Sequence, residues 1–154
     1  MKDTHFLDTN IFLRYLTGDD DQKYEACLTL FQQAERNEIS LVTSEGVIAE
    51  VVHVLSSPKH YQLSRSRIQI ALSRLLILSG LKVPQRQVCL RALDLYTKHN
   101  LDFEDCLSLA HMEQQNLTQL YSYDQGFDAI AGVSRLEPSA AEANVVESRH
   151  QEPA

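Results

Sequence analysis

The sequence lacks long apolar runs and is poor in basic residues. No segment approaches the roughly 18 consecutive apolar residues that a membrane-spanning helix needs. The opening Met-Lys-Asp-Thr-His places polar side chains where a secretory signal needs apolar ones. Lys and Arg total 14 against 21 Asp and Glu, a net charge of −7, which disfavours a protein that holds nucleic acid through a broad basic surface. We therefore expect a soluble, cytoplasmic protein with no membrane partner, in which any nucleic-acid site is local.

Paired cysteine and histidine patterns are also missing. The three cysteines, Cys27, Cys89 and Cys106, form no C-x-x-C spacing and have apolar neighbours, so we expect reduced thiols in the core. The six histidines show no H-x-x-x-H spacing. A zinc hydrolase is therefore disfavoured.

The chain of 154 residues, 44% hydrophobic and 23% charged, has the composition of one globular domain. Short apolar stretches that are typical of strands alternate with segments of helical periodicity. The expected strands cover residues 5–8, 39–43, 81–83, 120–123 and 133–136. This alternation predicts an α/β fold, a three-layer α/β/α sandwich with a central parallel sheet. We expect the domain to span residues 1–138 and residues 139–154 to form a flexible C-terminal tail with little to bury.

The expected helices begin at residues that commonly cap helices. Thr9 or Asn10 can cap the first, and Ser44 precedes a long apolar helix over residues 45–55. Ser64 opens a later helix, and Asp102 can cap another. These positions also locate the carboxylates discussed next.

Two aspartates, Asp8 and Asp124, directly follow expected strands. Ligands bind at the carboxyl ends of parallel strands, so both side chains are expected at one crevice. The alternative is that each simply caps the following turn or helix, which is the commoner role for either residue alone. Their coincidence favours the functional interpretation.

Two further carboxylates lie on helices. Glu50 and His53 are the ionisable residues of an otherwise apolar stretch, so we expect Glu50 to be partly buried and to need a cation or donors beside it. The alternative is a pair with an arginine or with His53. Asp105 lies one turn into its helix, where contact with the helix N-terminus would explain it without any function.

Four carboxylates in one crevice would repel one another unless hard cations lie between them. Oxygen-only ligands favour Mg²⁺ or Mn²⁺ over zinc. Two such ions could activate a water and stabilise the leaving oxygen of a phosphodiester. The groups available to contact a substrate backbone are basic, although such clusters are more often solvated helix faces: Arg14, Lys59, Arg65, Arg67 and Arg74.

Four segments of the chain resemble, in order and spacing, the successive motifs of PIN-domain nucleases. They are Leu7-Asp8-Thr9-Asn10-Ile11-Phe12, Thr43-Ser44 with Ala49-Glu50-Val51, Leu101-Asp102-Phe103-Glu104-Asp105-Cys106-Leu107, and Tyr121-Ser122-Tyr123-Asp124 with Phe127. The resemblance extends from about His5 to Pro138. In size the chain is most similar to the VapC-type toxin ribonucleases of bacterial toxin–antitoxin pairs.

This resemblance implies Mg²⁺- or Mn²⁺-dependent hydrolysis of RNA. By motif, the acidic quartet is matched by Asp8, Glu50, Asp105 and Asp124, with Asp8, Asp105 and Asp124 as metal ligands. Possible auxiliary residues are Asn10, Asp102, Ser122 and Asp128. The resemblance further implies a homodimer and a cognate antitoxin protein, and assigns no role to the segment after Pro138.

Two other interpretations remain open from the residues themselves. One is a phosphatase or phospho-acceptor domain with Asp8 as nucleophile, but Asn10 stands where a D-x-D loop needs its second carboxylate. The other is a non-catalytic module whose acidic groove binds a basic partner, since the presence of all four acids does not prove turnover.

Overall fold

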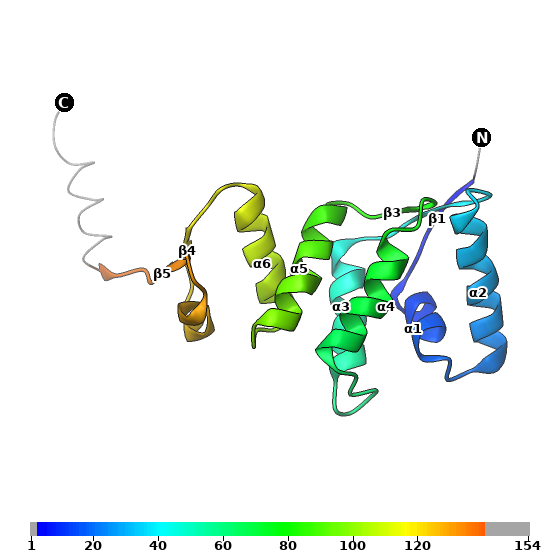
Figure 1. Ribbon diagram of the computed structural model, residues 1–154, viewed down its shortest axis with the longest axis horizontal. Coiled ribbons are helices and arrows are strands. Elements are labelled where there is room, and N and C mark those ends of the chain that lie inside the picture. The colour runs from blue at the N-terminus through cyan, green and yellow to red at the C-terminus, as the bar shows by residue number, and fades with distance from the viewer. Residues whose placement is uncertain (1–2, 141–154) are drawn as a thin grey trace. The chain divides into compact units, whose positions relative to one another are not determined.

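The computed structural model describes residues 3–140 of the chain. The chain divides into two compact units, Met1–His111 and Met112–Ala154, and each is described by itself. Figure 1 labels the elements of both units along the chain. The predicted single domain of residues 1–138 stays a prediction, and most of the expected tail, residues 141–154, lies outside the described residues.

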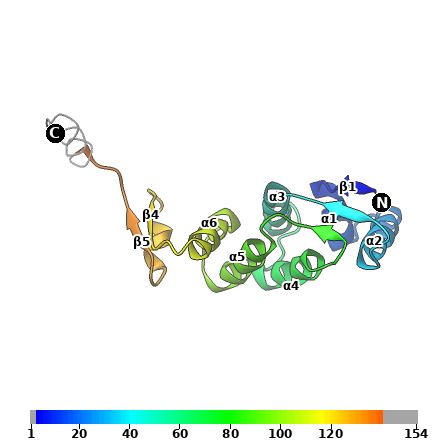
Figure 2. The ribbon, with the colours of Figure 1, turned by 90° about the horizontal axis from the view of Figure 1, so that it is seen from above.

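A three-stranded parallel sheet forms the first unit's scaffold. Its strands are β1 (Thr4–Phe6), β2 (Ser40–Val42) and β3 (Leu81–Lys82), in the spatial order β1-β2-β3. Phe6 pairs with Val42, and Val42 pairs with Lys82, so all three carboxyl ends lie at one edge of the sheet. Figure 2 shows these strands side by side.

Six helices join and follow these strands, and local capping explains where several begin. The helices are α1 (Thr9–Thr17), α2 (Asp21–Glu35), α3 (Glu45–Ser56), α4 (Arg65–Leu76), α5 (Arg86–Lys98) and α6 (Phe103–Gln114). The Ser44 hydroxyl accepts a 3.2 Å hydrogen bond from the Val47 amide, and the Ser64 hydroxyl accepts one of 3.3 Å from Arg67. Both predicted serine caps are therefore confirmed.

The core of the first unit lies between helices that pack in sequence: α1 on α2 and α3, α3 on α4, and α4 on α5. Phe12 of α1 is fully buried, and its ring centroid lies 5.9 Å from that of Phe31 in α2. The three cysteines are free and buried, as predicted. Such burial of aromatic and aliphatic side chains is the main favourable contribution to folding.

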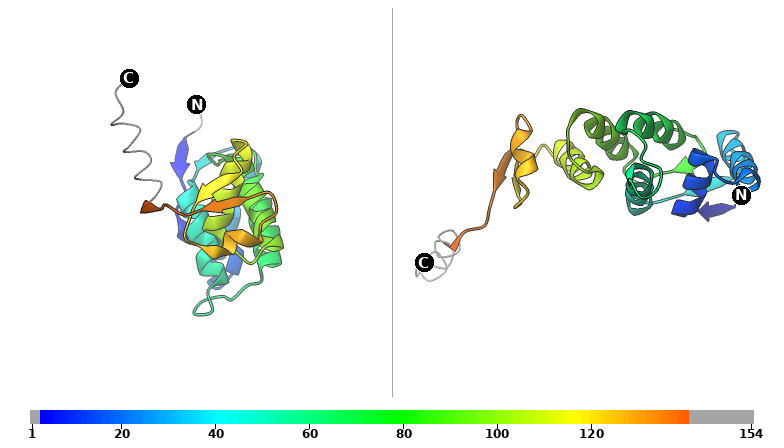
Figure 3. Two further views of the ribbon diagram at one scale, coloured as in Figure 1. Left: turned by 90° about the vertical axis from the view of Figure 1, so that its left-hand side faces the viewer. Right: turned by 90° about the horizontal axis from the view of Figure 1, so that it is seen from below.

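The second unit contains a parallel strand pair. Its elements are β4 (Gln119–Tyr121), the 3₁₀ helix η1 (Gln125–Ala129) and β5 (Ser134–Leu136), and Figure 3 shows them in two further views. Arg135 of β5 contacts Asp128 at 2.8 Å and the Ser122 carbonyl at 2.9 Å. This arginine therefore joins η1 to the end of β4.

The predicted α/β class with parallel strands is confirmed. All three observed strand pairings among the described residues are parallel. The first strand begins and ends earlier than expected, at Thr4–Phe6 instead of residues 5–8. None of the helices within residues 3–140 has the length and apolar character needed to span a membrane.

Candidate functional site

The first candidate, Asp8, lies at the carboxyl edge of the sheet. It follows β1 by two residues, and its Oδ1 accepts a 2.8 Å hydrogen bond from the Thr9 amide as the N-cap of α1. The expectation that Thr9 or Asn10 caps this helix is therefore wrong, because Asp8 already supplies the oxygen. Asp8 and Asn10 are both exposed.

The end of β2 is hydrogen-bonded to Leu7, the residue before Asp8. The Leu7 amide donates a 2.8 Å hydrogen bond to the Val42 carbonyl, and the buried Thr43 hydroxyl donates one of 3.1 Å to the Leu7 carbonyl. Residue 44 then opens α3, which carries Glu50. The backbone directly before Asp8 is thus held by hydrogen bonds to the end of β2.

Glu50 is exposed, so the prediction of partial burial is wrong. The buried face of α3 consists of Ile48, Val51, Val52 and Leu55. Glu50 lies on the opposite face, because the helical period separates it from this stripe. Within residues 3–140, neither an arginine nor His53 bonds to Glu50, so the predicted alternative of a structural ion pair is not observed.

Two acids lie at the start of α6. The exposed Asp102 carboxylate accepts a 2.9 Å hydrogen bond from the Asp105 amide, which confirms its predicted capping role. Asp105 is half-buried and has an interaction with a neighbouring group. Burial raises the pKa of the adjacent Cys106 thiol to about 11; the positive charge of Arg65 lowers this pKa and the charges of Asp102 and Asp105 raise it. The charge of Arg65 and the charges of these two acids therefore affect the same thiol, that of Cys106.

The remaining candidates lie in the second unit. Asp124 is exposed, and its Oδ1 accepts a 2.8 Å hydrogen bond from the Gly126 amide as the N-cap of η1. The Ser122 hydroxyl accepts a 3.0 Å bond from the Asp124 amide. The carboxylate of Asp128 is bonded by Arg135 at 2.8 and 3.3 Å, and these bonds hold the pKa of Asp128 below its ordinary value.

The candidates divide between the two units. Asp8, Asn10, Glu50, Asp102 and Asp105 belong to the first, and Ser122, Asp124 and Asp128 to the second. Within the described range, no group of three or more His, Cys, Asp or Glu side chains is close enough to hold a metal ion. The alternative role of the two aspartates as caps is observed: Asp8 caps α1 in the first unit, and Asp124 caps η1 in the second.

The basic residues that could contact the substrate backbone differ in their surroundings. Arg14 bonds both oxygens of Asp19 at 3.0 Å, and Tyr61 donates a 2.6 Å bond to the same carboxylate. Arg65 is half-buried and bonds to main-chain carbonyls. The three others are exposed: Arg67 and Arg74 on α4, and Lys59 in the turn between α3 and α4.

The sequence interpretation missed the roles of Thr43 and Arg65. From the sequence, Thr43 is the end of an expected strand and part of a motif. Arg65 is one of several basic residues that could contact a substrate backbone. Their partners are 36 positions away for the Thr43–Leu7 bond and 31 to 36 positions away for the bonds of Arg65. No local sequence pattern reveals such a partner.

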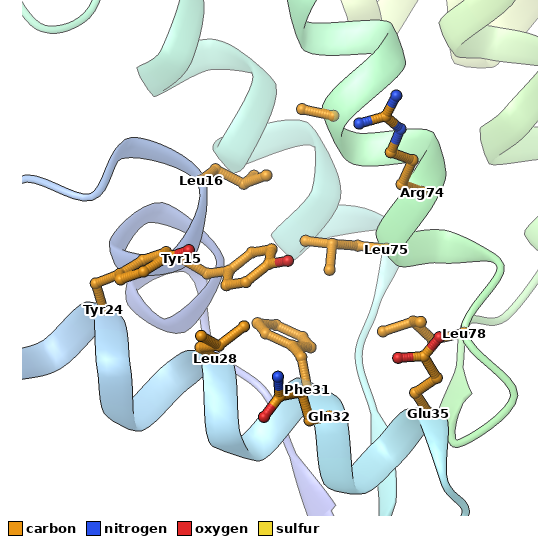
Figure 4. Close-up of a pocket in the computed structure, with 11 residues that line it drawn as sticks. Tyr15, Leu16, Tyr24, Leu28, Phe31, Gln32, Glu35, Arg74, Leu75 and Leu78 are labelled. Atoms are coloured by element: carbon orange, nitrogen blue, oxygen red, sulfur yellow. The ribbon is translucent and has the colours of Figure 1, made fainter.

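Two of the hollows in the first unit are compared with the candidate site. One, of about 540 Å³, lies between α1, α2 and α4, and Figure 4 shows the stacked rings of Tyr15 and Tyr24 at one side and Glu35 at the other. None of the candidate acids lines it. The other, of about 460 Å³, is lined by Asp102 and Glu104, with Arg65 and Tyr96 in its wall. Of the candidate acids, the auxiliary residue Asp102 lines the second hollow, and none of the acidic quartet does.

Comparison with known proteins identifies relatives. A VapC ribonuclease of Aquifex aeolicus (strain VF5) is 26% identical over 132 residues, which cover 86% of this chain and 95% of that protein.

Two crystal structures also match. One is Mycobacterium tuberculosis VapC20, a toxin that cleaves the sarcin-ricin loop (18% identity, 87% of this chain and 99% of that one, TM-score 0.35). The other is VapBC2 of Rickettsia felis bound to a promoter DNA fragment (20% identity, 88% and 98%, TM-score 0.36).

The decisive match is to a family model. The PIN domain model matches residues 5–133, a segment that contains every candidate acid from Asp8 to Asp128. The order and spacing of the four motifs agree with this match. This chain therefore belongs to the PIN-domain family.

Proposed function

We propose that this protein is an endoribonuclease that uses Mg²⁺ or Mn²⁺ to hydrolyse RNA phosphodiester bonds. The observation that carries the proposal is the PIN domain match over residues 5–133, within which Asp8, Glu50, Asp105 and Asp124 occur in order. The similarity to a VapC ribonuclease over 95% of that protein supports an enzyme of the same class.

The chemistry of the first unit's acids fits hard divalent cations. Asp8 uses one oxygen for the Thr9 amide, and the Glu50 carboxylate makes no hydrogen bond or ion pair within residues 3–140, so neither carboxylate is neutralised by an arginine there. Carboxylate oxygens are preferred ligands of Mg²⁺ and Mn²⁺. When bound, such ions would supply an activated water and charge stabilisation at the leaving oxygen.

The residues have distinct proposed roles. Asp8, Asp105 and Asp124 would hold the ions, and Glu50 would complete the metal site or orient the attacking water. Asn10 and Ser122 would assist as small polar groups. Asp102, which caps α6 through one oxygen as Asp8 caps α1, would be an auxiliary residue, whereas the pairing of Asp128 with Arg135 favours a structural role for Asp128.

We further propose that the protein is the toxin of a toxin–antitoxin pair, acting in the cytoplasm as a homodimer. The motif resemblance to VapC-type toxins supports this proposal. An antitoxin with basic residues would suit the acidic balance of 21 Asp and Glu against 14 Lys and Arg. Co-expression with the product of an adjacent short gene, followed by co-purification, tests the pairing.

The test of activity uses two matched Asp→Asn variants. Asp8 and Asp20 both cap helices, and Asn caps about as well as Asp, so both variants should keep the stability of the fold. We expect Asp8→Asn to abolish Mn²⁺-dependent cleavage of RNA, whereas Asp20→Asn should cleave as the wild type does. Cleavage at the wild-type rate by Asp8→Asn would refute the assignment of Asp8.

Two other results would replace the proposal. A wild-type protein that binds Mn²⁺ or a basic peptide without cleaving any RNA would be a binding module. A trapped aspartyl-phosphate on Asp8 would indicate a phospho-acceptor domain. Mass spectrometry of protein incubated with a phosphate donor detects the latter directly.

A further inference from the structure

Arg65 of α4 binds, through its guanidinium group, the end of α5 and the segment that leads to α6. It is the first residue of α4, and its Nη1 donates hydrogen bonds to the carbonyls of Tyr96 (3.0 Å), His99 (3.1 Å) and Leu101 (2.5 Å). The guanidinium carbon lies 4.1 Å from the centroid of the Tyr96 ring. One side chain therefore binds the last turn of α5 and the connection to α6.

These bonds satisfy carbonyls that a helix leaves without partners. The last carbonyls of α5 have no intrahelical donor, and a cation is favourable at a helix C-terminus. Tyr96 is 3% exposed and Leu101 is 6% exposed, so unpaired carbonyls in this region would be costly. The planar guanidinium also stacks on the tyrosine ring, which an ammonium group cannot do in the same way.

The third carbonyl bound by Arg65 belongs to Leu101, the residue directly before Asp102. Asp102 in turn accepts the 2.9 Å bond from the Asp105 amide, and the Cys106 amide donates a 3.1 Å bond to the Asp102 carbonyl. Two hydrogen bonds, joined by the peptide bond from Leu101 to Asp102, thus link the Arg65 guanidinium to the backbone of Asp105. Movement of the Leu101 carbonyl would shift the start of α6.

We infer that Arg65 is a positioning residue: it holds the backbone of the acidic first turn of α6, which carries Asp105, and thereby supports the binding of a divalent metal ion by the Asp105 carboxylate. The inference rests on the proposed function, in which Asp105 is a metal ligand. Groups that orient ligands typically change metal affinity or activity by about 10- to 100-fold when they are mutated. The role differs from a direct contact with RNA phosphate, because the Arg65 donors face main-chain carbonyls.

The experiment compares Arg65→Ala and Arg65→Lys with Arg86→Ala. Arg86 is a matched control, because it too binds a main-chain carbonyl of the same unit, that of Leu81 in β3, which is not part of the segment from Leu101 to Asp105. Four quantities are measured for each purified protein: the Mn²⁺ dissociation constant by electron paramagnetic resonance, kcat and KM for RNA cleavage, and the urea unfolding midpoint.

We expect Arg65→Ala to weaken Mn²⁺ binding by about 10-fold or more and to lower kcat with little change in KM for RNA. Arg65→Lys should restore binding only in part, and guanidinium ion at low concentration should partly rescue Arg65→Ala. Arg86→Ala should lower the unfolding midpoint and leave the Mn²⁺ dissociation constant unchanged. These results would separate positioning from general stabilisation.

Other results overturn the inference. If Arg65→Lys, or Arg65→Ala under conditions where it is folded, binds Mn²⁺ as tightly as the wild type, Arg65 does not position the metal site. A rise in KM for RNA with unchanged Mn²⁺ binding would make Arg65 a substrate contact instead. Wild-type protein that binds Mn²⁺ without cleaving RNA refutes the proposed function alone, and wild-type protein that does not bind Mn²⁺ refutes both.

Discussion

The Thr43 hydroxyl donates a 3.1 Å hydrogen bond to the Leu7 carbonyl and so joins the carboxyl ends of β2 and β1 one residue before Asp8. Thr43 is 1% exposed and is the buried polar residue of the described core. A buried hydroxyl that is hydrogen-bonded makes its surroundings more rigid. Without this hydroxyl, the Leu7 carbonyl would lose its donor, and the protein would lose stability. The bond therefore stabilises the fold and the backbone that carries Asp8.

Replacement of Thr43 by valine should destabilise the protein. The variant keeps the side-chain shape but leaves the Leu7 carbonyl without its donor, which costs about 1–3 kcal/mol. Urea unfolding measures the loss, and Thr43→Ser, which keeps the hydroxyl, should retain most of the stability. Equal unfolding midpoints for the valine variant and the wild type would show that the bond contributes nothing.

Gly80 should not tolerate a side chain. A Cβ at this position would lie 2.2 Å from the Ala34 carbonyl oxygen, a backbone atom that cannot move independently. We expect Gly80→Ala to lose about 1–3 kcal/mol or more of stability. Gly46→Ala is the control, because its nearest neighbour is the Ser44 hydroxyl at 3.8 Å, and alanine should stabilise α3 by about 0.5–1 kcal/mol. Chemical denaturation of both variants tests this opposite pair of effects.

Stability should depend on pH in the acid range through Asp19. The Tyr61 hydroxyl bond and the Arg14 contacts hold the pKa of Asp19 below its ordinary value of 3.8. The unfolded chain then binds a proton more readily than the folded one, so this stabilisation is complete above 3.8 and is lost as the pH falls through the folded-state pKa.

The variant Asp19→Asn isolates this effect. We expect it to melt below the wild type at neutral pH and to approach the wild type as the pH falls below 3.8. Thermal unfolding across this pH range is the measurement. A difference between the two proteins that stays constant with pH would contradict the assigned ionisation.

The buried thiols should be unreactive in the folded protein. Burial raises the pKa of Cys89 to about 12 and that of Cys106 to about 11, so each forms far less of the reactive thiolate than an exposed cysteine. For Cys106 the thiolate fraction is about a hundredfold lower than normal. We expect negligible alkylation of the native protein at mildly alkaline pH and modification of all three thiols after denaturation. Rapid native labelling, detected by mass spectrometry, would contradict their burial.

Several features could be predicted because their causes are local. Ser44, Ser64 and Asp102 bond to amides three positions ahead, and this geometry follows from the residue type and the start of an apolar period. The parallel strands follow from alternation with helices. Asp8 was correctly placed after the first strand, although its own capping of α1 was assigned to Thr9 or Asn10.

Other features could not be predicted because they depend on distant partners. Apolar neighbours along the chain indicated a buried Glu50, but the helix turns its side chain away from the core. Gly80 lies beyond the end of α4 at Leu76 and allows a close approach to Ala34, a partner 46 positions away that no local pattern reveals. The basic cluster that contains Arg65 is typical of a solvated helix face, but in the structure the Arg65 guanidinium binds main-chain carbonyls from another part of the chain.

The amino-acid sequence by itself determined the α/β class, most helix starts and the order of the acidic motifs, since capping, periodicity and strand ends act over a few residues. Tertiary structure alone decided which helix face carries Glu50, which donor holds the Leu7 carbonyl and what the Arg65 guanidinium binds. The physical reason is the distance along the chain between the interacting groups. The hydrogen bonds of Thr43 and Arg65 join residues 31 to 36 positions apart, and such partners, like burial, arise only when the chain packs.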